Sequence, residues 1–341
     1  MTAAEPGGSR AARRLARVGT GLAVAATAAA AAYAVQLVAA RRWRVDEETL
    51  VAAGLTIPAD ATHHFVATGD GGRLHVVERG EGPPIVLVHG ITLGAVTWAP
   101  QLHDLSRHHR VVAVDLRGHG PSLAGETGYS FTRMADDLLE VLAALSVERA
   151  VLVGHSMGGM ITLTAAVERR DELHRHVAGL ALVGTTAGPM LPGPGSALGP
   201  LFARTARRGL RLAERRGKGA VPQEDVAAWM IRGSFGERPD PADVALAKSM
   251  LSAMSPAALA ALLEPLLLFD VHDELGAVDF PTAVVVGTRD MLLRPSRLLA
   301  AGIPGATLTV LPGCGHMVML ERAEELDDVL TRLSREVAGA G

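Results

Sequence analysis

The segment from Ala150 to Gly159 constrains the fold of this chain more than any other feature. Four apolar residues come directly before Gly-His-Ser-Met-Gly-Gly, and a run of mostly small and apolar residues follows as far as Arg169. This pattern predicts a buried strand, a tight turn and a helix. Ser156 stands at the turn, with glycine two positions before it and two positions after it. A turn this sharp leaves room for little or no side chain beside it, and it presents the serine hydroxyl at the carboxyl edge of a sheet.

The rest of the chain favours a mainly parallel sheet with flanking helices. From about residue 62, short apolar runs alternate with glycine turns and amphipathic segments, which is typical of an α/β fold. The 341 residues, 48% of them hydrophobic, suffice for one large domain with an insertion or for two ordinary domains. The expected strands are His64–Thr68, Arg73–Glu78, Ile85–Val88, Val111–Asp115, Ala150–Val153, Leu180–Val183, Thr282–Val286 and Thr307–Leu311, and the expected helices are Phe131–Leu145, Gly158–Arg169 and Ala323–Val337.

The alternation stops between residues 187 and 280, where no convincing buried strand occurs. This block begins with a loop rich in glycine and proline and continues with helical patterns at Leu201–Arg215, Gln223–Ile231, Pro241–Met254 and Ala257–Leu268. It is too long to be a plain loop. We therefore predict a core formed by residues 62–186 and 281–338, with an inserted helical lid over 187–280. Its apolar residues, Trp229 and Met250 among them, favour an apolar acyl or aromatic pocket, although a lid also needs such residues to pack on the core.

The N-terminal region contains a candidate membrane segment. Residues 1–17 are basic, and residues 18–40 form an uncharged run flanked on both sides by arginine. The length of the run matches a bilayer-spanning helix, but much of it is alanine, which is only weakly apolar. A retained signal anchor, a cleaved signal peptide and a helix lying on a surface are the alternatives. The distribution of basic residues weakly favours a catalytic domain outside the cytoplasm, and a secreted or cytoplasmic protein is the alternative.

Composition excludes several functional classes. The net charge of −3 gives no sign of a nucleic-acid partner, which a basic domain would indicate. The single cysteine, Cys314, can form neither an intrachain disulfide nor a cysteine metal cluster, and we expect no cofactor and no metal. Cys314 lies two residues before His316, but side chains at this spacing on a short loop usually diverge. We therefore expect Cys314 to be a small loop residue rather than the partner of a catalytic histidine.

A serine hydroxyl is a poor nucleophile at neutral pH and needs a general base beside it. His316 is the strongest candidate because it follows the expected strand Thr307–Leu311, at the same sheet edge as Ser156, and precedes an acidic helix. The other histidines after Ser156 are His174, His176 and His272, which lie at a charged helix end or in the expected lid.

An acid must orient the imidazole and stabilise its charged form. Asp290 follows the expected strand Thr282–Val286 through Gly287-Thr288-Arg289, in the chain order serine, acid, histidine. Its rivals Asp270, Asp273 and Asp279 come before that strand, in the lid or at the wrong edge of the sheet. We therefore expect Ser156, Asp290 and His316 to act together.

A tetrahedral intermediate needs two hydrogen-bond donors for its oxyanion. The amide of Met157 is the first candidate, because it lies at the start of the helix after Ser156. The second is expected from the loop after strand Ile85–Val88, where Gly90 lets the backbone turn and Ile91 offers its amide.

Taken together, these motifs resemble the α/β-hydrolase superfamily. The matching elements are Val88-His89-Gly90, Trp98, Val114-Asp115-Leu116-Arg117-Gly118-His119-Gly120-Pro121-Ser122, Gly154-His155-Ser156-Met157-Gly158-Gly159, Gly287 with Asp290, and Gly313-Cys314-Gly315-His316. The resemblance is to the branch that holds small esterases, carbon–carbon bond hydrolases, cofactor-free haloperoxidases and epoxide hydrolases. It implies a triad of Ser156, Asp290 and His316, oxyanion amides at Ile91 and Met157, and structural roles for Arg117 and His119.

Serine at position 156 narrows the expected chemistry. Epoxide hydrolases and haloalkane dehalogenases carry aspartate there, so an ester, thioester, lactone, amide or vinylogous ketone is the better expectation for this chain. We predict a serine hydrolase that cleaves a carboxylic ester or related acyl bond of an apolar small molecule. A carbon–carbon hydrolase and an acyltransferase with the same triad are alternatives, and a non-catalytic, membrane-anchored ligand-binding protein is the alternative from another class.

Overall fold

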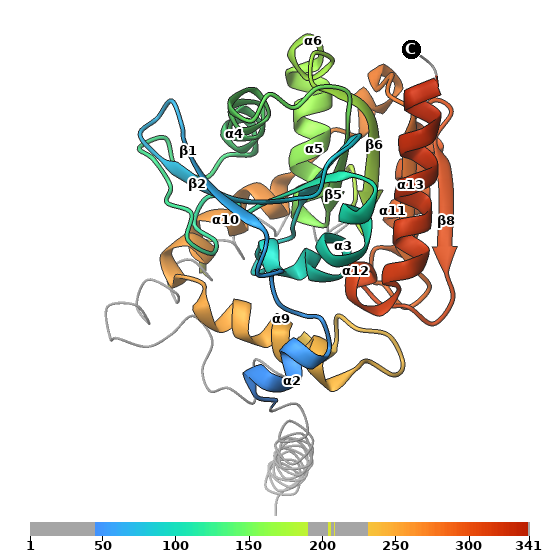
Figure 1. Ribbon diagram of the computed structural model, residues 1–341. Coiled ribbons are helices and arrows are strands. Elements are labelled where there is room, and N and C mark those ends of the chain that lie inside the picture. Colours follow the sequence, from blue (N-terminus) through green and yellow to red (C-terminus); the bar gives the residue numbers. More distant parts are fainter. Residues whose placement is uncertain (1–44, 190–203, 206–207, 209–230, 340–341) are drawn as a thin grey trace, which may run out of the picture.

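The computed structural model describes residues 45–189, 204–205, 208 and 231–339. A single eight-stranded sheet runs through the molecule in the order β1-β2-β4-β3-β5-β6-β7-β8 (Figure 1). The strands are β1 (Thr62–Ala67), β2 (Arg73–Arg79), β3 (Pro84–Val88), β4 (Arg110–Val114), β5 (Ala150–His155), β6 (Val177–Val183), β7 (Thr282–Gly287) and β8 (Thr307–Leu311). The β1–β2 and β2–β4 pairs are antiparallel and all other pairs are parallel. The predicted α/β fold with a mainly parallel sheet is confirmed.

Helices cover both faces of the sheet. The longer ones are α4 (Phe131–Ala144), α5 (Met157–Glu168), α9 (Pro241–Ala253), α10 (Pro256–Leu268), α11 (Leu293–Gly302) and α13 (Ala323–Gly339). The shorter ones are α2 (Glu47–Ala52), α3 (Ala99–Asp104), α6 (Arg170–Leu173), α12 (Val318–Glu321) and the 3-10 turns η2 (Ala95–Trp98), η3 (Leu105–Arg107) and η4 (His272–Ala277). Ser130 caps α4 by accepting a hydrogen bond from the Arg133 amide, 3.2 Å away.

Side chains along the central strands point alternately to the two faces of the sheet, and the interior therefore consists of two apolar cores. In β5, Leu152 packs with residues of α4 and α5, whereas its neighbours Val151 and Val153 pack with residues of α3 and α13. Successive side chains of a strand point to opposite faces, so each core occupies one face. Because both faces of β5 are covered, its chain is fully buried, as expected for a central parallel strand.

The block expected as a lid is described only in part. Its predicted helices Pro241–Met254 and Ala257–Leu268 are present as α9 and α10, and no strand occurs among the residues described between 187 and 280. Most of the predicted helix Leu201–Arg215 and nearly all of Gln223–Ile231 lie outside the described residues. In Figure 1, α9 lies beyond the end of the sheet toward which the arrow of β8 points. A lid function for this block stays a prediction.

The candidate membrane segment, residues 18–40, also lies outside the described residues. Within the described part of the chain, no single helix is long and apolar enough to cross a membrane. Helices α9 and α10 reach that length and hydropathy only together, across a bend of 102°.

Candidate active site

The turn after β5 holds Ser156 in a strained backbone conformation. Its φ of 52° and ψ of −117° lie in a region that residues with a side chain rarely adopt. The flanking glycines are required by close packing. A Cβ at Gly158 would lie 2.4 Å from the Val88 carbonyl oxygen, and one at Gly154 would lie 2.6 Å from the carbonyl oxygen of Gly158. The sequence pattern and the geometry therefore agree on a tight, strained turn at Ser156.

His316 and Asp290 form a hydrogen-bonded pair at the ends of β8 and β7. His316 Nδ1 lies 2.9 Å from Asp290 Oδ2, and the Leu292 amide donates to Asp290 Oδ1 over 2.8 Å. Burial alone would raise the pKa of Asp290, but the bonds from His316 and Leu292 outweigh it and lower this pKa from its ordinary value. An ionised Asp290 accepts the Nδ1 proton of a neutral imidazole, and Nε2 is then free to accept a proton.

Three loops bring this pair together with Ser156. His155 Nε2 donates to the His316 carbonyl oxygen over 2.9 Å, and the two imidazole rings lie 4.7 Å apart between centroids. At Gly184, where β6 ends with φ of 51°, a Cβ would lie 2.9 Å from Asp290 Oδ2. At Gly90 a Cβ would lie 3.0 Å from Ser156 Cβ. The residues predicted from separate strand ends therefore lie at one site.

The two expected oxyanion donors are close to Ser156. Met157 follows Ser156 in the chain, and Ile91 follows Gly90, which packs against Ser156. Among the described residues, no group accepts a hydrogen bond from the Ile91 or the Met157 amide. The Ile91 loop is fixed from behind by two histidines. His89 Nδ1 donates to the Gly90 carbonyl over 2.7 Å, and the Thr92 amide donates to His119 Nε2 over 3.3 Å. Neither amide is therefore engaged by another described group, as the role expected of them requires.

His119 and Arg117 have structural contacts. Burial, followed by the neighbouring His89, lowers the pKa of His119 to about 3, so its ring stays neutral and Nε2 can accept from Thr92. Arg117 is fully buried and pairs with Asp137 at 2.6 Å and with Asp70 at 3.0 Å. These contacts hold the turn behind the Ile91 loop.

Glu321 holds the loop that carries His316. The sequence alone does not reveal this role. Its carboxylate accepts hydrogen bonds from the amides of Gly315 (2.9 Å) and Gly236 (2.7 Å). The His316 amide donates to the Ser234 carbonyl over 2.7 Å. The only signal in the sequence was a carboxylate five residues after the histidine, and nothing there distinguishes it from the other acids of the acidic segment that follows. The sequence likewise gives no sign of the contact between His155 and the His316 carbonyl.

Cys314 does not pair with His316. Its Sγ donates to the Gly315 carbonyl oxygen over 3.6 Å and lies 4.0 Å from a carboxylate oxygen of Glu321. Burial, and then the charge of Glu321, raise the pKa of this thiol to about 12. Because the thiolate is the reactive form, Cys314 is an inert buried residue, as the sequence predicted.

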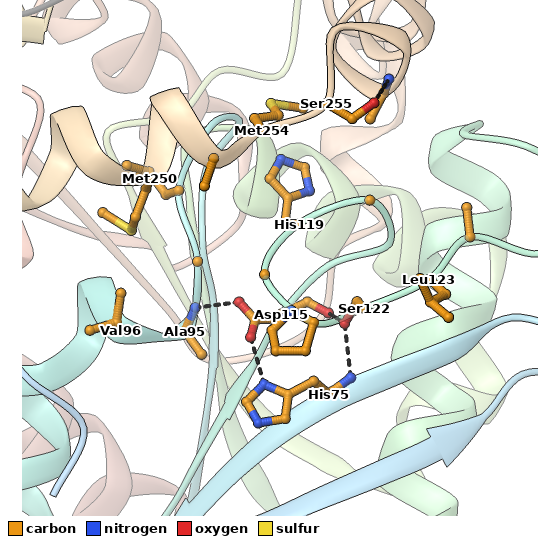
Figure 2. Close-up of a pocket in the computed structure, with 18 of the residues that line it drawn as sticks. His75, Ala95, Val96, Asp115, His119, Ser122, Leu123, Met250, Met254 and Ser255 are labelled. Carbon is orange, nitrogen blue, oxygen red and sulfur yellow. Dashed lines mark hydrogen bonds and ion pairs between the residues drawn. The ribbon is translucent and has the colours of Figure 1, made fainter. Parts of the chain in front are cut away.

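Two cavities lie near the site, although Ser156 is not among the lining residues of either. The first, of about 940 Å³, is enclosed by the segments that follow β6 and β7. The second, of about 500 Å³, lies between the turn Asp115–Ser122 and the junction of α9 and α10 (Figure 2). In the part of the chain that the structure describes, no group of three or more His, Cys, Asp or Glu residues is placed to hold a metal ion.

Residues 85–329 match the model of the alpha/beta hydrolase family. The chain belongs to this family. A putative carbamate hydrolase, RutD, from Rhizobium rhizogenes is 32% identical over 276 residues, which are 77% of this chain and 96% of that protein. An (E)-2-((N-methylformamido)methylene)succinate hydrolase from Acinetobacter baylyi is 38% identical, but the aligned part spans only 38% of its length.

Solved structures agree with this assignment. A thermophilic esterase from Thermogutta terrifontis is 28% identical with a TM-score of 0.69, and the alignment covers 82% of this chain and 99% of the esterase. A membrane phospholipase A described as a bacterial virulence factor is 25% identical with a TM-score of 0.65, over 96% of this chain and 99% of its own. These relatives and neighbours are alpha/beta hydrolase enzymes, and this chain is an enzyme of the same family.

Proposed function

We propose that this alpha/beta hydrolase is a serine hydrolase that cleaves a carboxylic ester or a related acyl bond of a small molecule. The observation that carries the proposal is the hydrogen-bonded pair of Asp290 and His316, 2.9 Å apart, beside a serine in a strained turn. Similarity to an esterase supports the ester bond. Serine in place of aspartate at position 156 supports an acyl-enzyme intermediate over epoxide or halide chemistry.

The proposed reaction proceeds in two halves. His316 Nε2 takes the proton of the Ser156 hydroxyl while the serine oxygen attacks the substrate carbonyl carbon. The Ile91 and Met157 amides donate to the oxyanion that forms. His316 then gives its proton to the leaving alcohol as the carbon–oxygen bond breaks. In the second half water attacks the carbonyl carbon of the acyl-enzyme while His316 takes a proton from the water. His316 then returns this proton to the Ser156 oxygen as the acyl carbon–oxygen bond breaks, and the carboxylic acid is released.

A fluorophosphonate probe tests the nucleophile directly. We expect the intact mass of the wild-type protein to rise by one phosphonyl adduct that maps to Ser156, and the mass of Ser156→Ala to stay unchanged. Hydrolysis of p-nitrophenyl acetate should disappear together with the adduct. Equal labelling of both proteins would contradict the proposal. A wild-type protein that is neither labelled nor active on esters would support the non-catalytic alternative, and product release only in the presence of an added alcohol would support an acyltransferase.

We also propose that residues 18–40 anchor the enzyme in a membrane with the catalytic domain outside the cytoplasm. The support is the length of the uncharged run, its flanking arginines, and the likeness to a membrane phospholipase A over 96% of this chain. We expect the full-length protein to sediment with membranes after a high-salt wash. In intact spheroplasts, added protease should remove the large domain. Recovery in the soluble fraction, or digestion only after the membrane is permeabilised, would contradict the anchor or the orientation respectively.

A further inference from the structure

The cavity of about 940 Å³ is lined by segments that carry neighbours of Asp290 and Gly184 in the chain, although Asp290 and His316 are not themselves among its lining residues. One wall is the segment Thr186–Pro189, which starts two residues after Gly184, the glycine packed against both side chains of the pair. The other wall runs from Met291 to Leu299 and starts one residue after Asp290 itself. A group bound between these walls would therefore lie beside Leu292, whose amide donates to Asp290 Oδ1 over 2.8 Å.

The two walls are fixed to each other and to the inserted block. Ser296 is buried on α11, and its hydroxyl donates to the Thr185 carbonyl over 2.7 Å. On the far side, the Val271 amide donates to the Ala187 carbonyl over 2.7 Å. Backbone carbonyls of the segment after β6 thus accept hydrogen bonds from α11 and from the inserted block. The shape of the cavity is therefore largely preformed, as in most small-molecule sites.

The interior of this cavity is apolar. Its lining includes Ala187, Leu267, Leu292, Pro295, Leu298 and Leu299, and the ionisable side chains in the lining are Asp270, His272 and Arg294. Two large apolar side chains on its walls are left in contact with solvent: Met291 is 81% exposed and Leu298 is 53% exposed. An apolar occupant would remove this surface from water, which is favourable in proportion to the area covered.

We propose that this cavity is the acyl-chain site of the enzyme and that it selects esters of medium-length apolar carboxylic acids. The inference rests on the proposed serine hydrolase function. The occupant is an acyl chain rather than a charged group, since most of the lining residues offer apolar contacts. Leu298 is the residue that we expect to determine chain-length preference, because its exposed side chain lies on the wall contributed by α11.

The second cavity, shown in Figure 2, is the rival acyl site. It too carries apolar side chains, Met250 and Met254 among them. The polar groups in its wall, however, already have hydrogen-bond partners within the protein. His75 Nδ1 pairs with Asp115 at 2.7 Å, and Asp115 also accepts from the Ala95 amide at 2.7 Å. Leu123, 57% exposed, lines this cavity as Leu298 lines the first. The two leucines therefore provide matched positions for a test.

The test compares Leu298→Glu with Leu123→Glu in the full-length protein, using p-nitrophenyl acetate, butyrate, octanoate and laurate. We expect the wild-type enzyme to have at least about tenfold higher kcat/KM for octanoate than for acetate. Leu298→Glu should lose about tenfold or more on octanoate, because an ionised carboxylate is costly beside an acyl chain, and should stay within about twofold on acetate. Leu298→Met should keep the wild-type profile, and so should Leu123→Glu.

The outcomes separate this inference from the function on which it rests. If Leu298→Glu keeps the octanoate preference, or if Leu123→Glu loses it, the acyl chain does not lie in the cavity beside Asp290. A flat wild-type profile would also overturn the inference, while Ser156-dependent hydrolysis of acetate would still uphold the serine hydrolase. If acetate hydrolysis does not depend on Ser156, the proposed function itself fails.

Discussion

The Asp290→Asn variant is expected to hydrolyse p-nitrophenyl esters with a kcat about 10³- to 10⁴-fold below that of the wild-type enzyme. The substitution keeps the shape of the side chain, and its oxygen can still accept from the Leu292 amide, as Asp290 Oδ1 does over 2.8 Å. An amide that faces His316 Nδ1 with its NH₂ group, however, favours the imidazole tautomer that carries its proton on Nε2. That tautomer cannot accept the Ser156 proton, so the step that forms the acyl-enzyme slows.

A matched control is available among the aspartates that the sequence offered as rivals. Asp273 lies exposed in η4, well before β7 in the chain. Asp273→Asn should therefore keep kcat within about twofold, since an exposed carboxylate outside the site contributes little. Steady-state rates and circular dichroism of both variants check the prediction. An Asp290→Asn enzyme that folds normally and retains more than about a tenth of the wild-type kcat would remove Asp290 from the proposed mechanism.

The sheet could be predicted because each of its signals is local. Four apolar residues and the glycines around Ser156 predict a buried strand and a tight turn without reference to the rest of the chain. The strand before Asp290 was expected at Thr282–Val286 and is found at Thr282–Gly287, because a central parallel strand is a nearly continuous apolar run. Chain order and the common carboxyl edge of parallel strands then suffice to place Asp290 and His316 near each other.

The supports of the site could not be predicted, because they depend on contacts between distant segments. Glu321 joins the amides of Gly315 and Gly236, and the second of these is 85 residues away in the sequence. Neither hydrogen bond leaves a periodic pattern or a motif. His155 is similar: its place in the turn is clear from the sequence, but its bond to the His316 carbonyl depends on the loop after β8 reaching the end of β5, past the ends of β6 and β7. A motif marks Ser156 and His316 in the sequence, whereas nothing comparable marks Glu321.

Arg117 is the clearest case of a motif residue with a structural task, and its substitution should have a large effect on stability. Its guanidinium pairs with the buried carboxylates of Asp137 (2.6 Å) and Asp70 (3.0 Å) and donates to the Gly128 carbonyl. We expect Arg117→Met to lower the free energy of unfolding by about 3–5 kcal/mol, because both carboxylates lose a partner and stay buried. Urea unfolding of the full-length protein, followed by tryptophan fluorescence, measures the difference.

The pH dependence of this loss follows from the two carboxylates. The hydrogen bond from Arg117 holds the pKa of Asp70 well below its usual range. Asp70 therefore contributes stability above the pKa that it has in the unfolded chain, about 3.9, and this contribution is lost as the pH falls below that value. In Asp137, burial outweighs Arg117 and raises the pKa, so this group accepts a proton more readily once the arginine is gone. The stability difference between wild type and Arg117→Met should thus be largest at neutral pH and should shrink below about pH 4.

Arg107 provides the control for this substitution. Its side chain is 71% exposed and pairs with Asp104 at 3.0 Å across one helical turn. An exposed pair of this kind contributes about 0–1 kcal/mol, so Arg107→Met should unfold at nearly the same urea concentration as the wild type. A loss below about 1 kcal/mol in Arg117→Met would contradict the structural role. A normal stability combined with a large fall in kcat would instead assign Arg117 to the chemistry, acting through the turn that bears His119 and supports the Ile91 loop.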